Sequence, residues 1–508
     1  MFCQLETLRN CLPQNVRGVL KELPKSLDET YERMLKEIGK VNPRQAHRLL
    51  QCLTVATRPL RVEELAEVLA LDFDGAKDGI PALNKGWRWD DHKQGVLSTC
   101  SSLIAIVDHA DGFSMFRVVQ FAHFSVKEFL TSDRLATLEA DISHFRIRLE
   151  PAHTVIAQAC LAILLESDNN DRANAGSPLH GYAAQHWVEH AQYENVSLHV
   201  EDGMRRLFDP SKLYFAAWLN SHIMDEGWHS FLPGHPDPMD YYPSFLQKPT
   251  SSIGDYAPFC LYHASLCGFL NLTKYFISEF PQHVNARIGY NKSPLVAALF
   301  NRHLRVAELL HRNGADVDVT SYKGRTPLHA ASEEGIVDVA RWLLDHGANP
   351  NSRESDHNTP LHLAAANGRL EIVRTLLEYS VDLNVVNIND RTPLHEASER
   401  GHVDIVRLLI QHGADANTHL QGLLNLASTS GSLETVLFFI GLGADVNGMD
   451  GSDSTALHQA SFRGNINIVG LLIERGADVN IRDRSNQTPL HMALSSVSDR
   501  DTLDAALC

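Results

Sequence analysis

The sequence has few positive charges for its size. Its 508 residues include 45 Lys and Arg against 62 Asp and Glu, a formal net charge of −17. The deficit is shared between the halves, because residues 1–256 carry 25 basic and 34 acidic residues and residues 257–508 carry 20 and 28. Neither half offers the clustered basic surface that a phosphate backbone requires. We therefore expect no nucleic-acid partner.

Long apolar runs and paired cysteines are also missing. The longest notable apolar run, Ala159–Leu165, is far shorter than a bilayer span, and the amino terminus MFCQLETLRN has no secretory hydrophobic region. The eight cysteines are scattered without a C-x-x-C pair, as expected in a reducing compartment. These absences predict a cytoplasmic protein without a membrane partner.

No catalytic or nucleotide-binding motif is present. There is no G-x-x-x-x-G-K-[ST] loop, since Gly39-Lys40 lacks both the upstream glycine and the hydroxyl residue, and H-E-x-x-H and G-x-S-x-G are absent. We expect no catalytic, cofactor-binding or metal-binding residues and no nucleotide in this chain, and hence a protein that is not an enzyme. The alternative is a regulatory fragment of an enzyme whose catalytic NTPase or hydrolase domain lies upstream or on another chain.

A repeated motif fills the second half. A serine or threonine recurs at a spacing of 33 residues, at Ser293, Thr326, Thr359 and Thr392 and again at Thr455 and Thr488. Thr caps a helix and Pro is tolerated at the first helical position, so the recurring Thr-Pro starts a helix. A glycine suited to stop the second helix recurs at Gly314, Gly347, Gly413, Gly443 and Gly476. A lone helix pair could not bury its apolar face, so the units must stack into a solenoid.

The pattern TPLHxAxxxGxxxxVxxLLxxGAxxN resembles the ankyrin repeat. The resemblance covers residues 257–508 as seven full units and a partial eighth, which begin near Ala257, Gly289, Ser321, Ser355, Ile388, Thr418, Gly451 and Arg484. It implies helix pairs joined by β-hairpin fingers and a concave face that binds a protein partner.

The repeated histidine raises the question of a metal site. Stacked units lie about 8–10 Å apart, whereas zinc ligands lie about 2.0–2.1 Å from the ion, so equivalent imidazoles of adjacent units cannot share a metal. The ankyrin resemblance implies instead that this histidine supports the hydrogen bonding of the hairpin and the neighbouring unit. That role falls on His329, His362, His395, His458 and His491.

Two departures from the motif mark weak points. One copy reads Gly422-Leu423-Leu424-Asn425, and the spacing from Gly401 to Gly431 is 30 residues instead of 33. We expect a short hairpin and an uncapped helix there. Ser380 replaces the terminal glycine of the fourth unit, at a cost of about 1 kcal/mol if the position stays left-handed. The array is predicted to be least stable between Ser380 and Ser430.

The ankyrin resemblance also implies where a partner would bind, at the finger tips and the exposed start of the inner helix. Tyr, Phe and Arg at such positions are typical of interface hot spots. The candidate partner-binding residues are Tyr290, Phe300, Tyr322, Lys323, Arg325, Glu333, Glu334, Asp356, Asn358, Asn389, Arg391, Glu399, Arg400, Phe462 and Arg463. The alternative is a solvated rim with a few stray aromatics.

The first half has no such period. The stretch LPKSLDETYERMLKEIG predicts a helix begun by a Ser26/Glu29 capping box, and helices in PRQAHRLLQCLTVATR and RVEELAEVLAL follow. A further helix at Gly95–Ser102 precedes a β-hairpin, which is the order of a winged helix. That helix contains no charged residue, and residues 44–134 carry 11 basic and 12 acidic residues. A reader of the DNA major groove needs more positive charge, so we expect a structural winged helix.

The stretch from LPKSLDETYERML to VVQFAHFSVKEFLTS, with PLHGYAAQHWVEHA and MRRLFDPSKLYFAAWL after it, resembles the region that follows the NTPase core in fungal NACHT-ankyrin proteins. In that NLR-like signalling class this region is similar to the winged helix of GPI inositol-deacylase. The resemblances imply a mainly α fold with a helical remnant of an upstream region at 1–25, a winged helix at 26–135, a helical region at 136–226, a Pro/Gly-rich linker at 227–256 and ankyrin repeats at 257–508. The expected function is a non-catalytic scaffold or sensor arm whose NACHT NTPase is not in this sequence.

Overall fold

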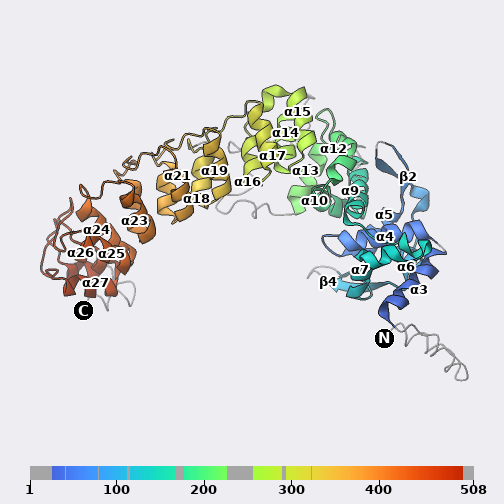
Figure 1. Ribbon diagram of the computed structural model, residues 1–508, viewed down its shortest axis with the longest axis horizontal. Helices are drawn as coiled ribbons and strands as arrows, with labels where there is room; N and C mark the ends of the chain where they lie inside the picture. Colours follow the sequence, from blue (N-terminus) through green and yellow to red (C-terminus); the bar gives the residue numbers. More distant parts are fainter. Residues whose placement is uncertain are drawn as a thin grey trace, which may run out of the picture. The chain divides into compact units, whose positions relative to one another are not determined.

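The computed structural model describes residues 26–40, 42–77, 79–110, 115–166, 177–225, 256–288, 293–321 and 323–495. The chain divides into two compact parts, an N-terminal region (Met1–His283) and a C-terminal region (Val284–Cys508). Figure 1 shows that the described residues are mainly helical, as the sequence predicts. The remnant expected at 1–25 and nearly all of the linker expected at 227–256 lie outside the described residues.

The N-terminal region begins with a winged helix. Helix α3 (Leu27–Gly39) is capped by Ser26, whose Oγ accepts the Glu29 amide at 3.2 Å. The helices that follow are α4 (Pro43–Val55), α5 (Val62–Leu69) and α6 (His92–Cys100). An antiparallel sheet has the order β1 (Leu60–Arg61), β5 (Met115–Phe121) and β4 (Ile104–Ala110). Strands β4 and β5 form the wing, so helices and hairpin follow the order that the sequence predicts.

Two local features of this domain differ from the sequence-based expectation. Strands β2 (Leu71–Lys77) and β3 (Ile80–Leu83) form an antiparallel hairpin that no sequence signal predicted. Helix α6 begins at His92 instead of Gly95, because the Asp91 carboxylate caps it by accepting the Gln94 amide at 3.1 Å. The helix therefore contains Lys93, and the expectation of a charge-free third helix was wrong.

The rest of the N-terminal region is helical and includes the helix pair of the first ankyrin-like unit. Its helices are α7 (Phe124–Thr131), α8 (Ala140–Ser143), α9 (Leu149–Leu165), α10 (His180–Ala191), α11 (Val196–His199), α12 (Glu201–Leu207), α13 (Tyr214–Asp225), α14 (Ala257–Leu266) and α15 (Leu270–Glu279). Trp187 of α10 is fully buried and stacks on Phe269, with ring centroids 5.5 Å apart. Gln192 donates to the Cys267 carbonyl at 2.8 Å. The pair α14–α15 thus shares a core with α10.

The C-terminal region is a series of helix pairs that follow one another along the chain (Figure 1). The pairs are α16 (Pro294–Phe300) and α17 (Leu304–Arg312), α18 (Pro327–Glu334) and α19 (Val337–Asp345), α20 (Pro360–Ala366) and α21 (Leu370–Leu377), α22 (Pro393–Arg400) and α23 (Val403–Gln411), α24 (Leu420–Ser430) and α25 (Leu433–Gly441), α26 (Ala456–Arg463) and α27 (Ile466–Glu474); α28 (Pro489–Ser495) begins the last. Apolar side chains of both helices, such as Leu328 and Leu343, are fully buried between the pairs.

Most helix starts and stops follow the sequence signals. Thr359 Oγ1 accepts the His362 amide at 3.4 Å, and Pro360 occupies the first turn of α20. Gly335 ends α18 in the left-handed conformation, with φ 83°. Helix α24 starts without a side-chain cap, which confirms that prediction. Ser380, however, is not left-handed. The condition for the cost predicted at Ser380 is therefore not met.

Candidate partner-binding surface

The motif histidines join their own helix start to the following finger. His329 Nδ1 accepts the Thr326 amide at 3.1 Å, and His329 Nε2 donates to the Asn358 carbonyl at 3.0 Å. The second bond recurs from His362 to the Arg391 carbonyl at 3.0 Å and from His458 to the Gln487 carbonyl at 3.1 Å. An imidazole that accepts at Nδ1 and donates at Nε2 is neutral. The supporting role that the ankyrin resemblance implies is confirmed for these three histidines.

Burial keeps His329 and His362 uncharged. The residues His329 and His362 are 0% and 1% exposed. Because a buried imidazolium loses its hydration, burial lowers the pKa of both side chains to about 4. Within the described ranges no group of three or more His, Cys, Asp or Glu could hold a metal ion. The hydrogen bonds and the burial of His329 and His362 therefore give these two histidines a scaffold role.

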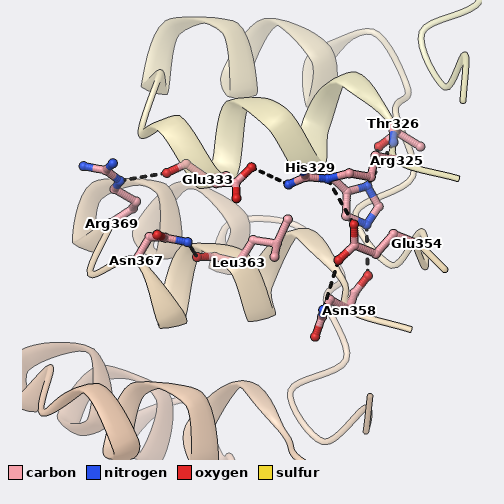
Figure 2. A network of polar contacts seen from close by, with 9 residues as sticks. All are labelled: Arg325, Thr326, His329, Glu333, Glu354, Asn358, Leu363, Asn367 and Arg369. Carbon is pink, nitrogen blue, oxygen red and sulfur yellow. Dashed lines mark hydrogen bonds and ion pairs between the residues drawn. The ribbon is translucent and has the colours of Figure 1, made fainter. Parts of the chain in front are cut away.

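A row of polar contacts links the third and fourth units (Figure 2) and continues to the fifth. Arg325 forms an ion pair with Glu333, and its Nε lies 3.0 Å from an Oε of Glu354. Glu354 is only 9% exposed and accepts a hydrogen bond from Asn358 Nδ2 at 3.0 Å. Asn387 then donates to Asn358 Oδ1 at 2.9 Å. These side chains tie each finger to the next one along the array.

The same pairing recurs two units later. Arg391 and Glu399 form an ion pair, and they lie 66 residues after Arg325 and Glu333. In both pairs the arginine directly precedes the motif threonine, and the glutamate lies in the last turn of the first helix. The structure thus brings together four of the candidate partner-binding residues, but as partners of one another. Their immediate role is to hold a finger against its helix.

The remaining candidates differ in exposure. Exposed side chains are those of Lys323, Glu334, Asp356, Asn389, Arg400, Phe462 and Arg463, and Phe300 and Asn358 are partly buried. Tyr290 and Tyr322 lie outside the described residues. Phe462 is 41% exposed, and the Arg463 guanidinium lies 5.9 Å from its ring centroid. The exposed ends of α22 and α26 therefore carry cationic and aromatic groups that are available for contact.

The residues that shape the fingers were missed in the sequence. Polar residues five positions before the motif threonine recur as Glu354, Asn387, Asp450 and Asp483. Asn387 Oδ1 accepts the amides of Asn389 and Arg391 at 3.0 and 3.1 Å, which is the bonding of an Asx turn. Asp450 accepts the Ser452 and Ser454 amides in the same way. A recurring polar residue at a fixed distance from the threonine was the available signal.

The surface around the wing of the N-terminal region combines exposed apolar residues with mixed charges. Met115 of the wing and Phe124 at the start of α7 are each 72% exposed. An open cavity beside the wing is lined by both Arg117 and Glu63, which lie 3.9 Å apart, and also by Asp108. Such a balanced set does not form the positive surface on which phosphate binding depends.

Comparison with known proteins agrees with both parts of this architecture. A family model described as ankyrin repeats, in three copies, matches residues 261–354, 347–419 and 424–506. A model described as the winged helix domain of GPI inositol-deacylase matches residues 31–144. The chain contains ankyrin repeats and a GPI inositol-deacylase-like winged helix. In the described residues, moreover, no helix is long and apolar enough to cross a membrane.

Individual relatives match parts of this chain. The azaphilone pigments biosynthesis cluster protein L of Monascus ruber is 33% identical over 310 residues, which are 59% of this chain and 61% of that relative. The match thus spans less than two thirds of the relative's length. The solved ankyrin repeat domain of human ASB11 is 28% identical and covers 42% of this chain and 98% of that one, with a TM-score of 0.37. The ankyrin repeat domain of Bcl-3, a member of the IkappaB family, is 28% identical and covers 49% and 97%, with a TM-score of 0.32.

Proposed function

We propose that this protein is a non-catalytic scaffold that binds a protein partner through the concave face of its ankyrin array. The supporting observation is a contrast between constant and varied positions. The motif Thr, His and Gly recur and build the frame. The last two positions of the first helix differ from unit to unit, as Glu333-Glu334, Glu399-Arg400 and Phe462-Arg463. A rigid frame that presents a varied row of side chains suits selective protein recognition.

The proposal extends to the cellular setting. The order of winged helix, helical region and ankyrin array, together with a fungal relative, supports a cytoplasmic sensor arm of an NLR-like signalling protein. The NACHT NTPase of such a protein would lie outside this sequence, since the sequence contains no P-loop. We propose no nucleic acid, membrane, nucleotide or cofactor as a partner of this chain.

Capture of partners by the tagged full chain from its native cells, followed by quantitative mass spectrometry, tests the proposed face. The variant R400E/F462A removes a cation and an exposed ring from the row, which should weaken partner capture at least 10-fold if each residue contributes about 1 kcal/mol or more. The control R374E/L437A also reverses an arginine charge and truncates an apolar side chain, but on the second helices α21 and α25, at exposed positions. Capture that survives R400E/F462A, or that R374E/L437A weakens equally, rules out this face.

The GPI inositol-deacylase-like winged helix supports a second candidate, a regulatory part of an enzyme whose catalytic domain lies elsewhere. Under this proposal the captured partner has hydrolase or NTPase activity that changes when the chain is added. Under the first proposal the isolated chain hydrolyses neither ATP nor a phosphatidylinositol ester. Hydrolysis by the isolated chain above that of a heat-inactivated sample contradicts both.

A further inference from the structure

Main-chain hydrogen bonds join neighbouring fingers. The fingers are the five residues before each motif threonine: 321–325 in the third unit, then 354–358, 387–391, 450–454 and 483–487. The Ser355 amide donates to the Lys323 carbonyl at 2.8 Å, and the Ile388 amide donates to the Asp356 carbonyl at 3.1 Å. The Arg484 amide donates to the Ser452 carbonyl at 3.2 Å. Each time, the second residue of one finger donates to the third residue of the finger before it.

The sixth unit has no finger. The segment that should carry it contains the three-residue deletion, and a local bond from the Thr418 amide to Asp415 closes it at 3.1 Å. Helix α24 then begins at Leu420, three residues earlier in the motif than the other first helices. As a result, the Asn389 carbonyl and the Gly451 amide, where the next bonds of the series belong, have no hydrogen-bond partner among the described residues.

The bonds from the motif histidine position to the next finger are present on only one side of the missing finger. Asn425 takes the place of the motif histidine and donates to the Ser454 carbonyl at 2.8 Å, so the sixth unit is tied to the seventh. His395 Nδ1 still accepts the Thr392 amide at 3.2 Å. In the described residues, however, His395 lacks the second bond that His329 makes to the next finger. The interruption therefore lies between the fifth and seventh fingers, above a packed helix pair.

The width of the interruption follows from the repeat. Units stack about 8–10 Å apart, so the fifth and seventh units are separated by about 16–20 Å. The two strands of a hairpin lie about 4.8 Å apart. The separation of the fifth and seventh units thus leaves room for one two-stranded turn between their fingers.

The sequence around this opening is acidic, although Asp453 is paired with Arg484 at 3.6 Å and Glu434 lies 4.0 Å from Arg407. From Leu408 to Phe462 the sequence contains no Lys or Arg, and its acidic residues are Asp415, Glu434, Asp445, Asp450 and Asp453. Asp390 at the tip of the fifth finger is exposed as well. Arg391 of that finger is paired with Glu399. The His395 imidazole at the base is neutral at pH 7, because burial lowers its pKa to about 4. The opening therefore favours a basic occupant.

We propose that this opening, the missing-finger site, binds a basic two-stranded turn of the partner, which replaces the absent finger. An amide of one strand donates to the Asn389 carbonyl, and a carbonyl of the other strand accepts the Gly451 amide. Lys or Arg side chains of the turn face the acidic residues. This inference rests on the proposed function, because it names the chemistry of the partner that the ankyrin array binds.

Gly451 permits a precise test because its amide can be removed without changing the turn. The Asp453 amide donates to the Asp450 carbonyl at 2.9 Å, which places Gly451 at the second turn position, where proline is favoured. A Cβ added at Gly451 meets no atom within 4 Å. Gly451→Pro therefore deletes the donor, and Gly451→Ala is the matched control that keeps it. In a third variant, the sequence of Asn447–Thr455 replaces Asn417–Gly422 and fills the opening with a finger.

The probe is a phage-displayed library of disulfide-closed hairpin peptides, selected on the full wild-type chain. Selected peptides should be enriched in Lys and Arg and should bind Gly451→Ala like the wild type. Loss of one hydrogen bond should weaken their binding to Gly451→Pro about 2–10-fold. The finger graft should abolish it. Failure to select a binder, peptides without a basic bias, or equal binding to the wild type and the graft each overturn the missing-finger site.

The native partner separates this inference from the proposed function. A partner that R400E/F462A weakens but that the finger graft and Gly451→Pro leave unchanged preserves the concave-face proposal and removes the missing-finger site. A partner that all three variants leave unchanged removes both. Thermal unfolding of each variant accompanies the binding data, and the graft should unfold at or above the wild-type temperature because it restores the finger contacts.

Discussion

The third to fifth units and the sixth unit share one sequence pattern, but different bonds hold them. In the third to fifth units, motif histidines, finger amides and the Arg325 network all cross from one unit to the next. At the junction of the fifth and sixth units, the described residues show neither the histidine bond nor the finger bond. Apolar packing persists there, since Leu424 and Val436 are fully buried. Burial, with bonds such as that from the Asp415 amide to Asn384 Oδ1 at 2.9 Å, therefore keeps the sixth unit in the stack. The histidine and finger bonds decide how firmly each unit is held.

Acid should have the largest effect on the firmly held units. The pKa values of His329, His362 and His395 are lowered to about 4 in the fold, against 6.5 for a free histidine. These groups contribute stability that is fully present above pH 6.5 and is lost as the pH falls toward 4, because the unfolded chain binds protons first. Urea midpoints measured between pH 7 and pH 4 should fall steeply.

The triple variant H329N/H362N/H395N is the control for the acid effect. Asn425 shows that asparagine can make the same bond to the next finger. The triple variant should lose less stability than the wild type over this range. An equal loss in both proteins would assign the acid sensitivity to groups other than these histidines.

Removing single motif histidines should sharpen the comparison between the two regions. His329→Ala deletes the bonds at its own helix start and the bond to the next finger, and leaves buried backbone groups unpaired, at a cost of about 2–4 kcal/mol. His395→Ala deletes only the bonds at its own helix start, at a cost of about 1–2 kcal/mol. Denaturant unfolding of both variants measures the difference. Equal costs would show that the bond to the next finger adds nothing.

The two kinds of arginine on the surface should differ in the same sense. Arg325→Met leaves the buried Glu354 carboxylate without its ion pair, and we expect a loss of about 1–3 kcal/mol. Arg400→Ala removes an exposed side chain and should change stability by less than about 0.5 kcal/mol. Its effect should appear in partner capture instead. A destabilised Arg400→Ala protein would contradict the assignment of Arg400 to the contact row.

A small gain in stability is expected at a finger tip of the firmly held region. His357 is left-handed, with φ 59°, at the position that Gly324 occupies in the previous finger. His357→Gly should relieve this strain and stabilise the array by about 0.5–1 kcal/mol. Thermal unfolding at pH 7 measures the gain. A lower unfolding temperature would mean that the His357 side chain supports the finger.

Local signals in the sequence predicted the starts and stops of helices but not the contacts between units. Thr359 and Pro360 start helix α20 through local bonding alone, so the helix start could be predicted from the sequence. The pairing of Arg325 with Glu333 joins a finger to a helix, which no helical or strand period reveals. The hairpin β2–β3 was missed for a similar reason. Its strands carry Gly75 and several acidic residues, which are typical of loops.

Ser380 shows a further limit of such local rules. The glycine that ends other second helices is left-handed, and a serine there was expected to carry strain. The chain avoids the strain because α21 ends at Leu377 and Glu378 stays in the right-handed region. The Ser380 carbonyl then accepts a hydrogen bond from Asn351 at 2.9 Å. A missing signal can thus be absorbed by a small change of backbone path, which only the structure reveals.

Hydrogen exchange of the full chain, read by mass spectrometry of short peptides, tests the central claim most directly. Within the C-terminal region, amides in α23, in α24 and in the segment between them should exchange fastest, while those in α18 and α20 remain protected. The boundary should lie at the missing finger, and the finger graft should remove it. Uniform protection from Ser380 to Ser430 would contradict the claim that the array is interrupted there.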